Sequence, residues 1–174
     1  MRRQDTQSIG RQAETLAESL LRERGFKVRN LNEERSNNPL YDLIAVKNRN
    51  EIAISVKCAR ANRQLRVGSP RMLKQMRDDC VVMAFLPTEK GREIEFCPGG
   101  YDLLIIPGRI ARDEGLELHK HYVKTHPGSA DHSVMVKDKV DRSERTRSGE
   151  VFKRWRDQYL DRWDTFDDVA PRGG

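Results

Sequence analysis

Hydrophobic residues near the start of the chain recur at the spacing of one face of a helix. This apolar stripe consists of Ile9, Ala13, Leu16, Ala17, Leu20 and Leu21. Ser8 precedes the stripe as an N-cap residue, and Gly25 stands where a helix stop is expected. The pattern therefore predicts an amphipathic helix over about residues 9–24.

Three short stretches with strand character follow. They are residues 26–31, which carry the weakest pattern, YDLIAV at 41–46 and EIAISVKC at 51–58. In the third stretch the hydrophobic residues alternate, which places Ser55 and Lys57 together on one face of the strand. The link between the second and third stretches is short and polar, so we expect these two strands to form an antiparallel hairpin.

The middle of the chain alternates between polar segments and short apolar runs. A basic loop is expected up to Gly68, after which Ser69 and Pro70 begin a helix that ends near Arg77. The continuous apolar run at 81–86 predicts a buried central strand. Weaker patterns predict two further strands at 93–96 and 101–106.

The chain is polar and irregular from His119 to Glu150, and the part from Ser129 to Glu150, rich in charge and serine, predicts a long loop with one strand at Val134 to Val136. Aromatic residues then recur at helical spacing from about Glu150 to Phe166. They are Phe152, Trp155, Tyr159, Trp163 and Phe166. We expect this helix to dock against the rest of the chain, and a helix that binds a partner is the alternative.

Length and element order together predict an α/β fold, with a central mixed sheet flanked by helices and an appended C-terminal helix. The 174 residues leave room for one domain and a short appendage. We divide the chain into a domain over 1–128, a charged loop over 129–149 and a docking helix over 150–168.

Composition narrows the class of protein. The chain has 33 Lys and Arg against 27 Asp and Glu, a net charge of +6, which is compatible with a nucleic-acid partner. The longest apolar run, 81–86, is too short to span a membrane, and no apolar segment follows the arginines near the N-terminus. Three widely spaced cysteines argue against a disulfide scaffold or a cysteine-rich zinc site, so we expect a cytoplasmic protein.

Two charged residues lie inside the apolar strands of the predicted hairpin. Asp42 stands within YDLIAV, and Lys57 stands near the end of EIAISVKC. Such groups are costly to bury unless they are paired or used. A partly exposed salt bridge at the sheet edge is one interpretation. The other is a Mg²⁺ site, in which the carboxylate holds the ion and the lysine serves the attacking water or the developing charge.

The order of these residues resembles the core of the PD-(D/E)XK nuclease superfamily, in particular its restriction-endonuclease-like and Holliday-junction-resolvase-like members. The similarity covers about the first 90 residues, through GRQAETLAESLLRERGFKV, NPLYDLIAV and EIAISVKCA. The resemblance implies that Glu14 and Asp42 bind the metal, that Pro39 is the motif proline, and that Lys57 is the catalytic lysine. At 100° per residue, Glu14 lies at the margin of the apolar stripe, from which it can reach the sheet edge. A solvent-exposed helical glutamate is the alternative.

The sequence departs from the family pattern at Ser55, where a second acid normally precedes the lysine. Three interpretations stay open. Asp42 and Glu14 suffice with the scissile phosphate, or another acid such as Glu33 or Glu34 completes the site. In the third interpretation, the site is catalytically degenerate and the domain only binds its ligand, without cleavage.

A run of positive charge follows the third strand. From Lys57 to Arg77 the chain contains seven cations and no acid. We expect phosphate contacts from Arg60, Arg63, Arg66, Arg71, Lys74 and Arg77. A solvated charged face is the alternative, although such faces usually mix signs. Gln75, on the same helix, resembles a polar position near the family's active site.

These features predict an endonuclease that cleaves DNA with Mg²⁺, for which Mn²⁺ would substitute. Double-stranded DNA is the expected partner, and no membrane is involved. Cutting both strands would favour two copies of the site, so a homodimer stays open. The alternative is a degenerate nuclease-fold module that binds nucleic acid or a partner protein without cleavage, and an RNase with the same core is a third candidate.

Overall fold

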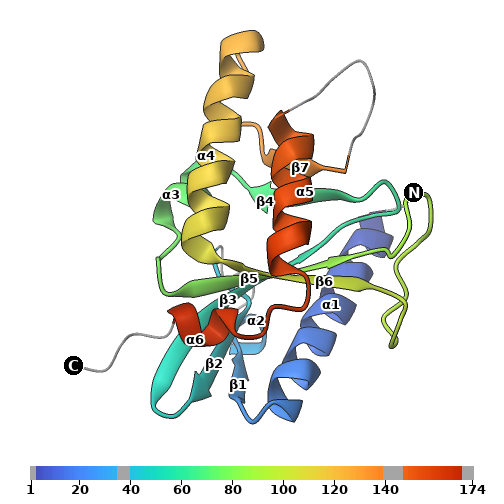
Figure 1. Cartoon of the computed structure of the whole chain (residues 1–174), viewed down its shortest axis with the longest axis vertical. Helices are drawn as coiled ribbons and strands as arrows, with labels where there is room; N and C mark the ends of the chain where they lie inside the picture. The colour runs from blue at the N-terminus through green and yellow to red at the C-terminus, as the bar shows by residue number, and fades with distance from the viewer. Residues whose placement is uncertain (1–2, 35–39, 139–146, 170–174) are drawn as a thin grey trace.

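A mixed sheet of five strands forms the centre of the molecule (Figure 1). The computed structural model describes residues 3–34, 40–138 and 147–169. The strands lie in the order β1 (Lys27–Asn30), β2 (Leu43–Lys47), β3 (Asn50–Cys58), β5 (Cys80–Leu86) and β6 (Asp102–Pro107). β3 and β5 run parallel, and the other neighbours run antiparallel. The predicted α/β class, with a mixed sheet flanked by helices, is confirmed.

The β2–β3 hairpin forms as predicted. Its register pairs Leu43 with Ile54 and Lys47 with Asn50. Asn48 and Arg49 turn the chain with positive φ angles of 51° and 68°, which suits the right-handed twist of the two strands. β3 is longer than β2, so its last residues have β5 as a neighbour on one side and no strand pairing with β2 on the other.

Helices cover both faces of the sheet, because the alternating strand residues supply two hydrophobic clusters. On one face α1 (Arg3–Glu23) buries Ala13, Ala17 and Leu21, the stripe that the sequence predicted, although the helix begins earlier than expected. Close to the same face lies α6 (Thr165–Val169), whose Phe166 contacts Phe26.

The opposite face carries a second layer. It contains α3 (Pro70–Gln75), α4 (Gly108–Thr125), α5 (Arg147–Tyr159) and a two-stranded sheet of β4 (Gln64–Gly68) and β7 (Val134–Lys137). A single turn, α2 (Leu31–Glu34), connects β1 to the segment before β2. None of the helices in the described ranges has both the length and the apolar character needed to cross a membrane.

Several sequence predictions need correction. The basic loop before Gly68 contains β4, whose Leu65 and Val67 are buried while Arg66 is exposed. No strand forms at 93–96. The predicted final helix divides at residues 160–164, where Asp161 takes a φ of 50°.

This break lets the aromatic residues of one segment reach both faces of the sheet. Trp155 is fully buried in the cluster under α5, and Phe166 packs into the cluster under α1. The C-terminal segment therefore packs on both faces of the sheet through two helices, α5 and α6.

α4 was not predicted, because glycines at two of its buried positions weaken the helical pattern. The structure explains both glycines by close approach. A Cβ at Gly115 would stand 2.9 Å from Leu73 Cδ1, and one at Gly108 would overlap Cys80 Sγ. Tight packing of α4 against α3 and β5 thus outweighs the cost of glycine in a helix.

Candidate active site

Asp42 lies at an open edge of β3. Because β2 begins at Leu43, the backbone N–H of Val56 has no β2 partner in the described ladder. The Asp42 side chain takes that place, since its Oδ2 accepts a hydrogen bond of 2.7 Å from the Val56 N–H. The Asp42 N–H donates in turn to the Ile54 carbonyl at 2.8 Å. These bonds fix the carboxylate beside β3, the strand that carries Ser55 and Lys57.

Asn32 joins Asp42 to Glu14. Its Nδ2 donates to Glu14 Oε2 at 3.1 Å and lies 3.4 Å from Asp42 Oδ1, a longer and weaker hydrogen bond. The two carboxylates, one from α1 and one from the edge of the hairpin, therefore converge on the same amide group. Sequence reasoning did not identify Asn32, because an asparagine in the polar segment NLNEE carries no distinguishing pattern.

The electrostatic environment of Glu14 reflects this convergence. Burial raises the pKa of the half-buried Glu14 carboxyl above its ordinary value, and the neighbouring Asp42 raises it further. The Asn32 hydrogen bond and the charges of Lys57 and Arg11 lower this pKa without cancelling the rise. The structure thus brings Asp42 and Lys57 each within electrostatic range of Glu14, and an added cation would favour the ionised form of Glu14.

Ser55 lies next to this group. It stands in β3 between Ile54 and Val56, which both hydrogen-bond to Asp42, and its parallel neighbour on β5 is Val82. The side chain is almost completely enclosed, with 1% of the residue exposed. Pro39 and the side chains of Glu33 and Glu34 lie outside the described residues.

The oxygen atoms of the group suit a hard cation. Among the described residues, no set of three or more His, Cys, Asp and Glu side chains is arranged to hold a metal ion. The site instead offers two carboxylates and one amide, from three residues that are each partly exposed. Mg²⁺ is commonly held by one or two carboxylates together with water and substrate phosphate. The residues present therefore fit Mg²⁺, for which Mn²⁺ is an alternative.

The basic stretch divides into exposed and buried cations. Arg60, Arg66, Arg71 and Lys74 are exposed, as is Gln75. Arg63 does not belong with them, because its side chain is 5% exposed and pairs with Asp102 and Asp138. It is buried by structural ion pairs and cannot contact a phosphate.

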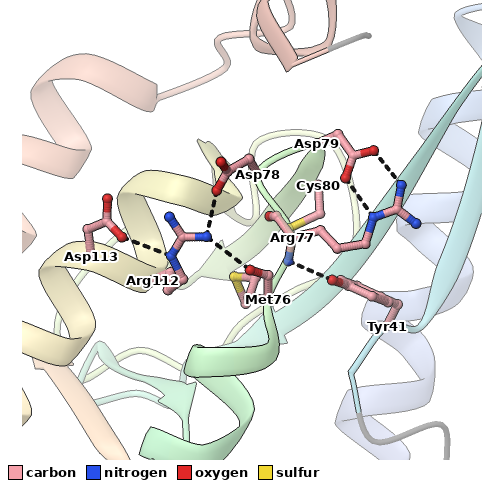
Figure 2. A network of polar contacts seen from close by, with 8 residues as sticks. All are labelled: Tyr41, Met76, Arg77, Asp78, Asp79, Cys80, Arg112 and Asp113. Atoms are coloured by element: carbon pink, nitrogen blue, oxygen red, sulfur yellow. Dashed lines mark hydrogen bonds and ion pairs between the residues drawn. The ribbon is translucent and has the colours of Figure 1, made fainter.

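Arg77 also differs from the prediction. Its guanidinium is exposed, but it pairs with Asp79, so this position carries little unopposed positive charge (Figure 2). The acid-free stretch of the sequence ends at Arg77, immediately before Asp78 and Asp79. Asp79 pairs with Arg77, and Asp78 pairs with Arg112.

The end of α3 is attached to the segment that carries Asp42. Figure 2 shows the Tyr41 hydroxyl accepting a hydrogen bond from the Arg77 N–H, at 2.9 Å. Ser69 caps the other end of the helix by accepting the Met72 N–H at 3.2 Å. Because Tyr41 directly precedes Asp42, the exposed cations of α3 are held on the structure that supports the candidate site.

A cysteine nucleophile is not supported near this site. Burial raises the pKa of Cys58 to about 12 and that of Cys80 to about 11, so both remain protonated and unreactive at neutral pH.

Comparisons of the chain with protein-family models, curated proteins and solved structures find no match. We therefore infer the function from the chemistry of the site. Two converging carboxylates, a nearby lysine and exposed cations on an adjoining helix can together hold a divalent cation and a phosphodiester backbone.

Proposed function

We propose that this protein is a metal-dependent endonuclease that hydrolyses phosphodiester bonds in DNA, with a core like that of the PD-(D/E)XK nucleases. The observation that carries the proposal is the convergence of Glu14 and Asp42 on Asn32, with Lys57 in electrostatic range. Glu14 comes from a helix, and Asp42 and Lys57 come from the hairpin that follows it, in the order of the family motif.

Each side chain has a defined role in this proposal. Glu14 and Asp42 would hold Mg²⁺, or Mn²⁺ in its place. The bound cation would polarise the scissile phosphate and lower the pKa of a coordinated water. Lys57 would orient or deprotonate the attacking water, or neutralise the negative charge that develops on the phosphate.

The substrate class follows from the exposed cations. Arg60, Arg66, Arg71 and Lys74 would contact the sugar–phosphate backbone, and such contacts make binding salt-dependent and insensitive to sequence. We propose double-stranded DNA as the substrate. A homodimer would place one site on each strand.

Ser55 favours a second candidate function. The family's second acid is replaced by a neutral, enclosed side chain, and a hydroxyl is a poor Mg²⁺ ligand compared with a carboxylate. The alternative is a module that binds nucleic acid or a partner protein without cleaving it. Cleavage assays separate the two functions directly.

The test is cleavage of supercoiled plasmid, linear duplex and RNA with Mg²⁺, Mn²⁺ or EDTA. Asp42→Asn retains an oxygen for the Val56 N–H while it removes the charge, and Lys57→Ala removes the amine. Each should lower the cleavage rate by about a hundredfold or more, as expected for loss of a group that acts in the transition state. Glu117→Gln, which removes an exposed carboxylate on α4, is the control and should leave the rate unchanged.

Full activity in a folded Asp42→Asn or Lys57→Ala protein would contradict this assignment of the active site. Cleavage of RNA but not DNA would change the substrate class. DNA binding without cleavage under any metal condition would favour the binding module.

A further inference from the structure

Asn32 has no counterpart in the nuclease motif described above, yet it is the side chain on which both acidic residues converge. Its amide nitrogen lies 3.1 Å from Glu14 Oε2 and 3.4 Å from Asp42 Oδ1. Asp42 Oδ2 is already occupied by the Val56 N–H, so Oδ1 is the oxygen that faces Asn32.

The backbone around Asn32 is fixed independently of these two contacts. The Asn32 N–H donates to Asn30 Oδ1 at 3.0 Å, which closes a local turn at the start of α2. The N–H of Leu31 donates to the Asp42 carbonyl at 3.0 Å, so α2 is tied to the residue whose side chain it meets. The backbone that carries the Asn32 side chain is therefore held by bonds other than those to the two carboxylates.

An asparagine side chain has a donor end and an acceptor end of nearly the same shape. Between two carboxylates and without a cation, the NH₂ group must face the acids, since the carbonyl oxygen would be repelled by them. With a divalent cation at the same place, the preference reverses, because an amide carbonyl is a hard oxygen ligand of the kind that Mg²⁺ accepts.

We propose that Asn32 completes the candidate metal site in place of the acid that is missing at position 55: without a cation it positions Glu14 and Asp42 through its NH₂ group, and when a cation binds it turns its carbonyl oxygen to the ion. This inference rests on the proposed function, because it assigns a role in the same site. It also explains how Ser55 can be neutral, since the third oxygen comes from α2 and not from β3.

A purely structural role for Asn32 makes different predictions. In that case the amide only ties α1 to the turn before β2, and its replacement lowers stability equally with and without a cation. The two roles are separated by the size of the stabilisation that Mg²⁺ confers on each variant.

The experiment measures Mg²⁺ and Mn²⁺ affinity by calorimetry, and the melting temperature with and without each metal, for the full chain and three variants. Asn32→Ala removes the bridge and the oxygen, and should weaken Mg²⁺ binding about tenfold to a hundredfold, as is typical when a supporting group of a metal site is lost. Asn32→Asp places a third carboxylate in the group. It should lower the melting temperature without metal and bind Mg²⁺ about tenfold more tightly than the natural chain.

Asn30→Ala is the matched control, because it removes the acceptor of the Asn32 N–H while leaving the Asn32 side chain in place. It should change the Mg²⁺ affinity by less than about threefold, well below the loss expected for a supporting group. If Asn30→Ala reproduces the loss seen in Asn32→Ala, loosening of α2 explains both results and the inference is overturned.

Further outcomes distinguish this inference from the proposed function. If the natural chain binds metal and both Asn32→Ala and Asn32→Asp bind it with the same affinity, the role of Asn32 is overturned. That result would not contradict the proposed function. No metal binding by the natural chain or by any variant would contradict both proposals. Binding gained only in Asn32→Asp would place Asn32 correctly in the group but would contradict a metal-dependent activity of the natural chain.

Discussion

Arg63 lies in the middle of the basic stretch, but its guanidinium supports the fold. Nη2 lies 3.1 Å from Asp102 Oδ2, and Nη1 donates to the Thr88 carbonyl at 3.2 Å. Nε lies 3.2 Å from Asp138 Oδ2 but forms no hydrogen bond with any described residue, so that contact is purely ionic. The guanidinium also stands 5.6 Å from the ring centre of Phe152 in α5. One side chain thus connects the start of β4 to β6, β7 and the C-terminal layer.

The effect of Arg63→Met can be estimated from these contacts. The substitution keeps most of the apolar stem but removes the Arg63 charge from Asp138, and leaves Asp102 with only the longer contact of 4.0 Å to Arg156. Removing one partner of a buried ion pair costs about 3–5 kcal/mol. The side chains of Asp102 and Asp138 remain 19% and 24% exposed, so water compensates part of the loss and the lower end of that range applies. A loss of about 3 kcal/mol corresponds to a decrease of roughly 6–12 °C in melting temperature for a chain of this size.

Arg66 provides the matched comparison, because it lies three residues further along but is exposed. Urea unfolding of Arg66→Met should give a free energy within about 0.5 kcal/mol of the natural chain. If Arg66 contacts a phosphate, its loss should reduce the log–log salt slope of DNA binding by about 1. Arg63→Met should show the opposite pattern, with a large loss of stability and an unchanged salt slope. Asp102→Asn added to Arg63→Met should recover part of the lost stability.

An Arg63→Met protein that unfolds within about 1 kcal/mol of the natural chain would refute this reasoning, since the smallest loss expected for a broken buried pair is larger. If Arg66→Met loses as much stability as Arg63→Met, the reasoning is also refuted. The difference in exposure between the two arginines would then have no effect on stability.

Two further predictions concern the candidate site. Because the pKa of Glu14 is raised in the folded protein, the folded state holds its proton more tightly, and stability should fall as pH rises above the ordinary value near 4.5. In metal-free urea unfolding, the free energy of unfolding of Glu14→Gln should therefore increase relative to that of the natural chain as the pH rises from 4 to 8. A constant difference between the two proteins over this range would contradict the raised pKa. Ser55→Glu should be destabilised without metal, because it adds volume and charge at a position that is 1% exposed, and Mg²⁺ should recover part of the loss. No recovery in melting temperature would count against a cation at this place.

The strongest sequence patterns gave the elements that support the site. The alternation in EIAISVKC and the short polar link identified the hairpin, and the unbroken apolar run identified β5 as a buried strand in the interior of the sheet. The weaker elements were lost because of single residues. Arg63 and Arg66 concealed the alternation of Leu65 and Val67 in β4, and two glycines concealed α4. At the two glycines of α4, tertiary packing requires a residue that local propensity disfavours.

The candidate site was predictable only where a residue conflicts with its local pattern. Asp42 and Lys57 interrupt apolar strands, and Glu14 lies at the margin of a helical stripe, so each could be selected from the sequence. Asn32 could not, because a polar residue in a polar turn conflicts with nothing. The burial of Arg63 could not be predicted either, since the sequence does not indicate that Asp102 and Asp138 approach it from distant strands.

The geometry at Asp42 also determines how its role should be tested. Because β3 extends beyond β2, the Val56 N–H needs an acceptor, and Oδ2 supplies one whether or not a cation ever binds. Asp42→Ala would leave that donor without its partner and would lower stability for a reason unrelated to chemistry. Asp42→Asn separates the two duties of the residue, since the amide oxygen can still accept the Val56 N–H while the negative charge is lost. We expect Asp42→Asn to be about as stable as the natural chain but to lose metal binding and cleavage. This result would assign the structural role to the acceptor oxygen and the catalytic role to the negative charge.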